Sequence, residues 1–153
     1  MADVRRLAPG AIVMKYDGLQ DYGRLPKRPI VLLYETEPNF GHWVCIVDTP
    51  EGIEHFDSYG ILPDNELKWV PKGLRHSTGQ DVKRLLSMLY DTGQKINYNE
   101  HRLQSKDAMT CGRWCALRIH FSYLPLEKFY RLIKTACKIY KLTPDELVAQ
   151  VVR

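Results

Sequence analysis

Residues 103–115 read LQSKDAMTCGRWC, a polar, loop-like segment that runs into a cysteine followed by glycine. The sequence then becomes apolar and helical, so Cys111 is expected at or near a helix N-terminus. There the helix dipole and the unpaired backbone N–H groups favour a thiolate. The same N–H groups can stabilise a developing oxyanion. Cys111 is therefore a candidate nucleophile, and the rest of the chain must supply the groups that a nucleophile needs.

The bulk composition predicts a single domain that spans residues 1–153. A chain of 153 residues is long enough to bury a substantial core. Its apolar fraction of 44% and charged fraction of 26% are ordinary for a soluble globular protein. No apolar run approaches the roughly 18 residues that a membrane span needs, and the N-terminus lacks the apolar segment of a secretory signal. We expect an intracellular protein that is neither membrane-bound nor secreted.

The charge of the chain is mildly basic, with a net charge of +4 and a pI near 8.9. Such a charge fits weak attraction to nucleic acid or to an acidic partner. The basic residues are scattered and form no long block of lysine and arginine, which favours a solvated surface instead. Weak nucleic-acid binding stays open as an alternative.

The four cysteines are expected to be free thiols, because the chain has no signal peptide. Cys115 follows Cys111 by four residues and lies on roughly the same helix face, so a metal or redox pair is one interpretation. The spacing differs from the Cys-x-x-Cys of zinc ribbons and thioredoxin-like sites, and no second pair of ligands is suitably spaced. We expect no metal site. The remaining thiols are assigned to the core, namely Cys45, Cys115 and Cys137.

The order of apolar patterns is strands, one helix, a strand and then helices, which favours an α+β fold with a mixed sheet. Residues 1–29 are rich in glycine and proline and are expected to form loops around short elements. Strands are predicted at 30–34, 42–48, 53–58 and 96–99. Helices are predicted at 80–90, 111 to about 124, 126–140 and 144 to the C-terminus. The last of these should begin with a capping box formed by Thr143 and Glu146.

A cysteine nucleophile needs a base that takes its proton and a third group that orients this base. His42 is the best candidate among the five histidines, because it follows Gly41 at the start of a strand. A side chain at a strand end can project into a cleft, whereas one in mid-strand usually packs. His55 lies in mid-strand and is expected to be a packed or surface histidine.

The predicted hairpin supplies an orienting acid. If Asp48 faces Ile53 across a four-residue turn, then Val44 faces Asp57. His42 then shares a face of the sheet with Asp57, and diagonal neighbours lie within about 7–8 Å at Cα. That separation lets their side chains form a hydrogen bond. A turn one residue longer or shorter would place the two side chains on opposite faces.

Two further residues complete the candidate site. Gln104 precedes Cys111 by seven residues, and its side-chain amide can curl back to donate to an oxyanion beside the Cys111 backbone N–H. Trp43 is either a core residue or a shield that fixes the orientation of the His42 imidazole.

Three segments resemble a known family: 41–43 (GHW), 56–60 (FDSYG) and 104–117 (QSKDAMTCGRWCAL). They look like the adenovirus maturation protease (adenain), which belongs to the cysteine-protease clan that also holds the SUMO- and ubiquitin-like-protein proteases. This family carries its catalytic residues in the order His, Asp or Glu, Gln, Cys. Asp57 stands where the adenoviral enzymes have Glu and the deconjugating proteases have Asp.

The resemblance implies a papain-like, adenain-like fold, in which a central mixed sheet is packed between helices and the nucleophile begins a buried helix. It implies a thiol endopeptidase that forms an acyl-enzyme and processes viral capsid precursors after small residues such as glycine. The general base, orienting acid, oxyanion donor and nucleophile would be His42, Asp57, Gln104 and Cys111, with Gly112 and Trp43 in support.

The resemblance also leaves alternatives. One is a deconjugating protease that cuts after the terminal glycine of a ubiquitin-like protein, another is an acetyltransferase related to bacterial effectors of the same clan, and a third is an inactive binding module. The chemistry requires no cofactor, although the adenoviral enzymes use an activating peptide and DNA. The expected partner is a protein substrate, either a viral precursor or a ubiquitin-like protein. The expected location is the host cytoplasm or nucleus, with packaging in the virion as an option.

Overall fold

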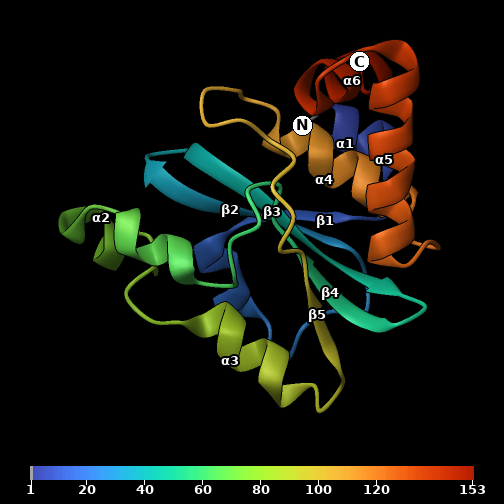
Figure 1. Cartoon of the computed structure of the whole chain (residues 1–153). Helices are drawn as coiled ribbons and strands as arrows, with labels where there is room; N and C mark the ends of the chain where they lie inside the picture. Colours follow the sequence, from blue (N-terminus) through green and yellow to red (C-terminus); the bar gives the residue numbers. More distant parts are fainter. Residues whose placement is uncertain (1) are drawn as a thin grey trace.

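A five-stranded sheet forms the centre of the computed structural model, which describes residues 2–153 (Figure 1). The strands lie in chain order across the sheet, from β1 to β5. The two outer pairs, β1–β2 and β4–β5, are parallel, and the two inner pairs are antiparallel. The strands cover Ile12–Lys15, Ile30–Glu37, Phe40–Thr49, Gly52–Phe56 and Ile96–Tyr98.

Helices lie on both sides of this sheet (Figure 1). The α-helices α1 to α6 cover Ala2–Leu7, Lys72–Ser77, Arg84–Asp91, Cys111–His120, Leu126–Tyr140 and Pro144–Val151. Two 3₁₀ helices, η1 and η2, cover Tyr16–Asp21 and Asn65–Trp69. Among residues 2–153, no helix combines the length and the apolar character that crossing a membrane requires.

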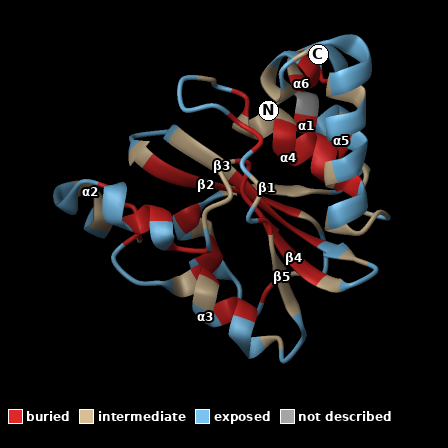
Figure 2. Ribbon diagram, in the orientation of Figure 1, coloured by how far each residue is buried: buried red, intermediate tan, exposed pale blue. Residues whose placement is uncertain are grey.

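Alternate residues of the central strands enter two separate cores. In β2, Val31 packs with α1, α4, α5 and α6, whereas Ile30 and Leu32 pack on the opposite face with η1 and α3. In β3, Cys45 belongs to the first core and Val44 to the second. Both strands are therefore buried on two faces, as Figure 2 shows. This explains why their sequences are nearly continuous apolar runs rather than alternating ones.

The structure confirms the α+β class, the mixed sheet and the placement of Cys111 as the first residue of α4. The helix predicted over 126–140 is observed with these bounds. The capping box is also present, because Thr143 and Glu146 bond each other's backbone N–H groups at the start of α6. These features depend on neighbouring residues, which a local pattern captures.

Other boundaries differ from the prediction because distant side chains set them. Helix α3 begins at Arg84 instead of residue 80, since the backbone N–H groups of Leu85 and Leu86 donate to Tyr16 Oη and Asp64 Oδ2. Strand β1 is a short element within residues 1–29, a segment predicted as loops around short elements, and the prediction did not locate it. Among the described residues it pairs only with β2, in parallel, so no hairpin signal marks it in the sequence.

A buried ion pair joins α4 to the sheet. Arg118 and Glu54 are both almost fully buried, and the guanidinium donates to both carboxylate oxygens at 2.7 and 3.0 Å. Arg118 also donates to the carbonyl oxygens of Phe121 and Leu124, which ends α4 at His120 and not near residue 124. Its guanidinium lies 4.9 Å from the ring centroid of Phe129. One side chain thus connects α4, β4 and α5.

We expect Arg118→Leu to lower the free energy of unfolding by roughly 3–5 kcal/mol, because it leaves the Glu54 carboxylate buried without a partner. The double variant Glu54→Leu/Arg118→Leu should recover part of this loss, since it removes both charges and leaves only two carbonyl groups unpaired. Urea unfolding of both variants measures the difference. Equal losses in the single and double variants would show that the uncompensated charge is not the cause.

Candidate active site

The β3–β4 hairpin brings His42 and Asp57 together as the sequence predicts. Asp48 pairs with Ile53 across the turn, and Cys45 pairs with Phe56. Asp57 follows the last residue of β4, and its Oδ1 lies 2.8 Å from Nε2 of His42. The predicted parity of the hairpin is therefore confirmed.

A glycine allows β3 to approach β2 immediately before His42. A Cβ atom at Gly41 would lie 1.9 Å from the carbonyl oxygen of Tyr34, so no other residue fits there. Tyr34 is also the cross-strand partner of His42. The position of the imidazole is thus fixed by close backbone contact on one side and by Asp57 on the other.

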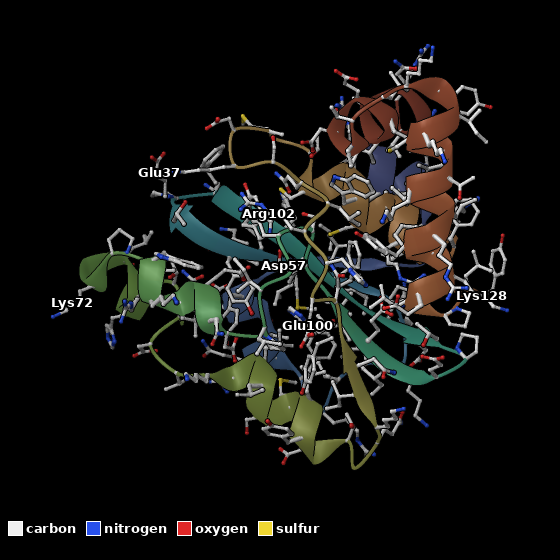
Figure 3. All side chains as sticks on the ribbon, in the orientation of Figure 1. Glu37, Asp57, Lys72, Glu100, Arg102 and Lys128 are labelled. Atoms are coloured by element: carbon white, nitrogen blue, oxygen red, sulfur yellow. The ribbon has the colours of Figure 1, made fainter. Side chains whose placement is uncertain are left out.

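Asp57 is fully buried behind the imidazole, at the centre of the molecule in Figure 3. Its Oδ1 accepts hydrogen bonds from His42 Nε2 and from the backbone N–H of Tyr59, both at 2.8 Å. Burial alone raises the pKa of this carboxyl, but hydrogen bonds with Glu66 and His42 bring the pKa below its ordinary value. Asp57 is therefore an anion that faces the imidazole.

The His42 imidazole lies between Asp57 and the Cys111 thiol. Burial lowers the pKa of His42, yet hydrogen bonds with Asp57 and Cys111 outweigh it and raise the pKa to about 9. Since Asp57 occupies Nε2, Nδ1 is the nitrogen left for the thiol. The ring of Tyr59 stacks on the imidazole with centroids 4.6 Å apart. The ring that stacks on His42 is therefore that of Tyr59. Trp43 packs against the core and lines the cleft.

Cys111 lies where α4 begins, and the electrostatics there favour its thiolate. Burial raises the pKa of the thiol, but hydrogen bonds from His42 and from the backbone N–H groups of Trp43 and Gly112 bring the pKa below its ordinary value. Thr110, at the N-cap, makes no side-chain cap, because its hydroxyl donates to Asp145 Oδ1 at 2.6 Å. The Thr110 side chain therefore does not cap the N–H groups of the first turn, and one of them, the N–H of Gly112, interacts with the thiol.

Gln104 is buried beside this group, as the resemblance implies. Its Oε1 accepts from the hydroxyl of Ser58 at 2.6 Å, which fixes the orientation of the amide. Its Nε2 donates to the carbonyl of Ala108 at 2.5 Å and is 3.4 Å from the hydroxyl of Tyr59. The second contact is long for a hydrogen bond, so one N–H of the amide can turn to a better acceptor.

An open cleft of about 540 Å³ exposes these groups to solvent. The part of its lining that concerns the chemistry consists of His42, Trp43, Tyr59, Gln104, Cys111 and Gly112. The structure thus brings together all six predicted site residues, with Asp57 behind the imidazole. Cys45 and Cys115 are buried, Cys137 is partly buried, and all of them are free thiols.

One site residue, Glu66, was not predicted. It lies on η2, is 5% exposed, and its Oε1 is 3.8 Å from His42 Nε2. No motif surrounds it in the sequence, and only the tertiary fold brings it to the hairpin. His42, Asp57 and Glu66 offer ligand atoms within 4.8 Å of one another. However, His42 Nε2 and Asp57 Oδ1 already bond each other, so we do not assign these residues as a metal site.

His55 is a packed residue, as its mid-strand position predicts. It is fully buried, and neither ring nitrogen has a hydrogen-bond partner among the described residues. Burial lowers the pKa of His55 from 6.5 to about 4. The unfolded chain therefore takes up this proton more readily than the folded chain between pH 6.5 and 4, and stability falls as the pH falls through this window.

We expect His55→Leu to remove this pH dependence. Relative to the native protein, the variant should gain stability as the pH falls from 7 to 4, by a total on the order of 3 kcal/mol. Urea unfolding at a series of pH values measures the gain. His120→Gln, which changes an exposed histidine that forms no ion pair among the described residues, is the control. A constant difference between native protein and His55→Leu at pH 7 and pH 4 contradicts the prediction.

Comparison with known proteins gives one informative match. No model of a protein family matches the chain. The chain is 38% identical over 142 residues to "Uncharacterized protein V9" of the Sputnik virophage, an alignment that covers 91% of this chain and 81% of that protein. The match thus extends over both halves of the site, the hairpin and the start of α4. The chain belongs to the family of this virophage protein.

Proposed function

We propose that the protein is a cysteine endopeptidase with an adenain-like fold, and that Cys111 is its nucleophile. The observation that carries the proposal is the position of His42 between two groups. Its Nε2 lies 2.8 Å from the Asp57 carboxylate, and its imidazole lowers the pKa of the Cys111 thiol in the same cleft. A thiol at a helix start, a base beside it and an acid behind the base are the parts that thiol proteolysis needs.

The geometry suggests the course of acylation. The Cys111 thiolate attacks the carbonyl carbon of the scissile peptide bond and forms a C–S bond. The His42 imidazolium then gives its proton to the leaving nitrogen as the C–N bond breaks. Asp57 accepts from Nε2 throughout, so it holds the imidazole in the orientation that points Nδ1 at the sulfur. A thioester on Cys111 and a free amine result.

Hydrolysis reverses the roles. His42, now neutral, takes a proton from water, and the oxygen attacks the thioester carbon. The C–S bond breaks, the carboxylic acid leaves, and the proton on His42 again faces a Cys111 thiolate. In both steps the oxyanion would receive hydrogen bonds from the Gln104 amide and from the backbone N–H of Cys111. The Ser58 hydroxyl keeps the amide nitrogen directed toward the cleft.

The substrate class rests on the family. The relative is a virophage protein, and the resemblance to adenoviral proteases implies viral precursor proteins cut after small residues. The exposed side chains of Phe40 and Met109 line the cleft and offer apolar contacts to an extended peptide. A deconjugating protease is the second candidate. The observation in its favour is the residue type at position 57, because the deconjugating proteases have Asp where the adenoviral enzymes have Glu.

Cys111→Ala is expected to abolish cleavage of fluorogenic peptides that carry glycine before the scissile bond, by at least about 10³-fold in kcat/KM. Cys137→Ala, which removes a thiol away from the cleft, is the matched control.

Alkylation of Cys111 by iodoacetamide should proceed at a lower pH than that of free cysteine, because the pKa of Cys111 is lowered. A vinyl-sulfone probe with a ubiquitin-like tail labels Cys111 only if the deconjugating function is correct. If Cys111 shows no more reactivity than free cysteine, the protein is a binding module.

Gln104→Ala should lower kcat by about 10²-fold with little change in KM, because the lost donor acts on the oxyanion and not on the bound peptide. Alkylation of Cys111 forms no oxyanion, so its rate should stay within about twofold of the native rate. Gln94→Ala, an exposed glutamine, is the control. A parallel loss of peptidase activity and alkylation rate would mean that Gln104 only supports the local structure.

A further inference from the structure

Glu66 is a second buried carboxyl group next to Asp57 and His42. Asp57 Oδ2 and both oxygens of Glu66 are buried without an N–H or hydroxyl partner among the described residues. The two carboxyl groups nevertheless lie close together, since His42, Asp57 and Glu66 offer ligand atoms within 4.8 Å of one another. A hydrogen bond between the carboxyl groups lowers the pKa of Asp57 and raises that of Glu66. Two carboxylates side by side in a buried site cannot both be ionised, whereas one proton between them satisfies an oxygen on each.

The donors around the pair decide which residue holds the proton. Asp57 Oδ1 accepts from His42 Nε2 and from the Tyr59 backbone N–H, and both bonds favour a carboxylate. Glu66 accepts from no such donor among the described residues. Burial and then the neighbouring Asp57 raise the pKa of Glu66 well above its ordinary value. The proton therefore belongs on Glu66, where its O–H can donate to Asp57 Oδ2.

A buried network places Glu66 where this contact forms. Asp64, two residues earlier, adopts a left-handed backbone conformation with φ of 65°, and its carboxylate accepts from the hydroxyls of Tyr16 and Tyr34 at 2.9 and 3.0 Å. Tyr34 is the cross-strand partner of His42. The start of η2 is thus fixed to the strand position opposite the catalytic base, and Glu66 is held close to it.

We propose that Glu66 is a positioning residue that donates the shared proton of a Glu66–Asp57 acid pair and so holds the Asp57 carboxylate in the orientation that His42 requires. This inference rests on the proposed function of His42, Asp57 and Cys111. With Oδ2 held by Glu66, Oδ1 stays directed at Nε2. A neutral Glu66 also keeps one negative charge behind the imidazole instead of two, so His42 can release its proton to the leaving nitrogen.

Several titratable groups face Glu66 and enter any pH profile. They come from β2, from β3, from the residue before η2, from the segment after β4 and from α4: Tyr34, His42, Asp64, Asp57 and Cys111. Because Asp57 and His42 titrate together with Cys111, the pH profile of Cys111 alkylation reports the state of the whole group. This profile requires no peptide substrate.

The test compares Glu66→Gln with Glu66→Leu, and uses Glu37→Gln, an exposed glutamate, as the control. Glutamine is neutral and can still donate to Asp57 Oδ2, so Glu66→Gln should keep kcat within about threefold of the native value. Leucine removes the donor, so Glu66→Leu should lower kcat about tenfold with KM nearly unchanged. The acid limb of its alkylation profile should move to higher pH, because Asp57 loses the hydrogen bond that favours its anion.

An infrared difference spectrum supplies a readout that does not depend on activity. The native protein at neutral pH should show the C=O stretch of a buried protonated carboxyl group that is missing from Glu66→Gln and retained in Glu37→Gln. If Glu66→Leu does not fold, this spectrum and the kinetics of Glu66→Gln decide the matter. Three outcomes would each overturn the proposal. The first is a Glu66→Gln variant as impaired as Glu66→Leu, and the second is a Glu66→Leu variant with native kinetics and pH profile. The third is the absence of the protonated band. A native Cys111 no more reactive than free cysteine refutes the proposed function, while the infrared result still decides the protonation of Glu66.

Discussion

The ion pair between Arg118 and Glu54 is the contact on which the geometry of the site depends. Glu54 precedes Asp57 by three residues on β4, and Arg118 follows Cys111 by seven residues on α4. Because both side chains are buried, neither can exchange its partner for water without a large desolvation cost. The pair therefore fixes the helix that carries the thiol relative to the strand that leads to the acid. Its charges lie away from the cleft, so it positions His42, Asp57 and Cys111 without competing for their protons.

The protonation states around the cleft follow from what each group faces. His42, Asp57 and Cys111 face one another, so an imidazolium can lie between two anions. His55 is buried without a partner, and burial keeps it neutral. Within the site, the groups that remain charged are those that neutralise one another. A buried site of this kind can hold a reactive thiolate at neutral pH because the opposite charge is in contact with it.

The sequence predicted those features that depend on spacing within one segment. The parity of the β3–β4 hairpin placed His42 beside Asp57, and the polar-to-apolar change placed Cys111 at the start of α4. Features that depend on contacts between distant segments were missed. Strand β1 is recognisable only by its parallel partner, and Glu66 only by the network that fixes Asp64. Likewise, α4 ends at His120 because Arg118 takes the carbonyl groups that follow, a contact that no helical pattern encodes.

The segment 56–60 shows why one short motif carries so much of the site. Its backbone accepts two N–H groups at Ser58, from Leu103 and Gln104, so the loop that leads to the nucleophile is attached directly to the segment with the acid. The next residue, Tyr59, donates its backbone N–H to Asp57 and stacks its ring on His42. At Gly60, with φ of 76°, a Cβ atom would lie 2.8 Å from the carbonyl oxygen of Glu100. Ser58 and Tyr59 therefore contact different parts of the site, and a shift of the segment by one residue would separate His42, Asp57 and Gln104 at once.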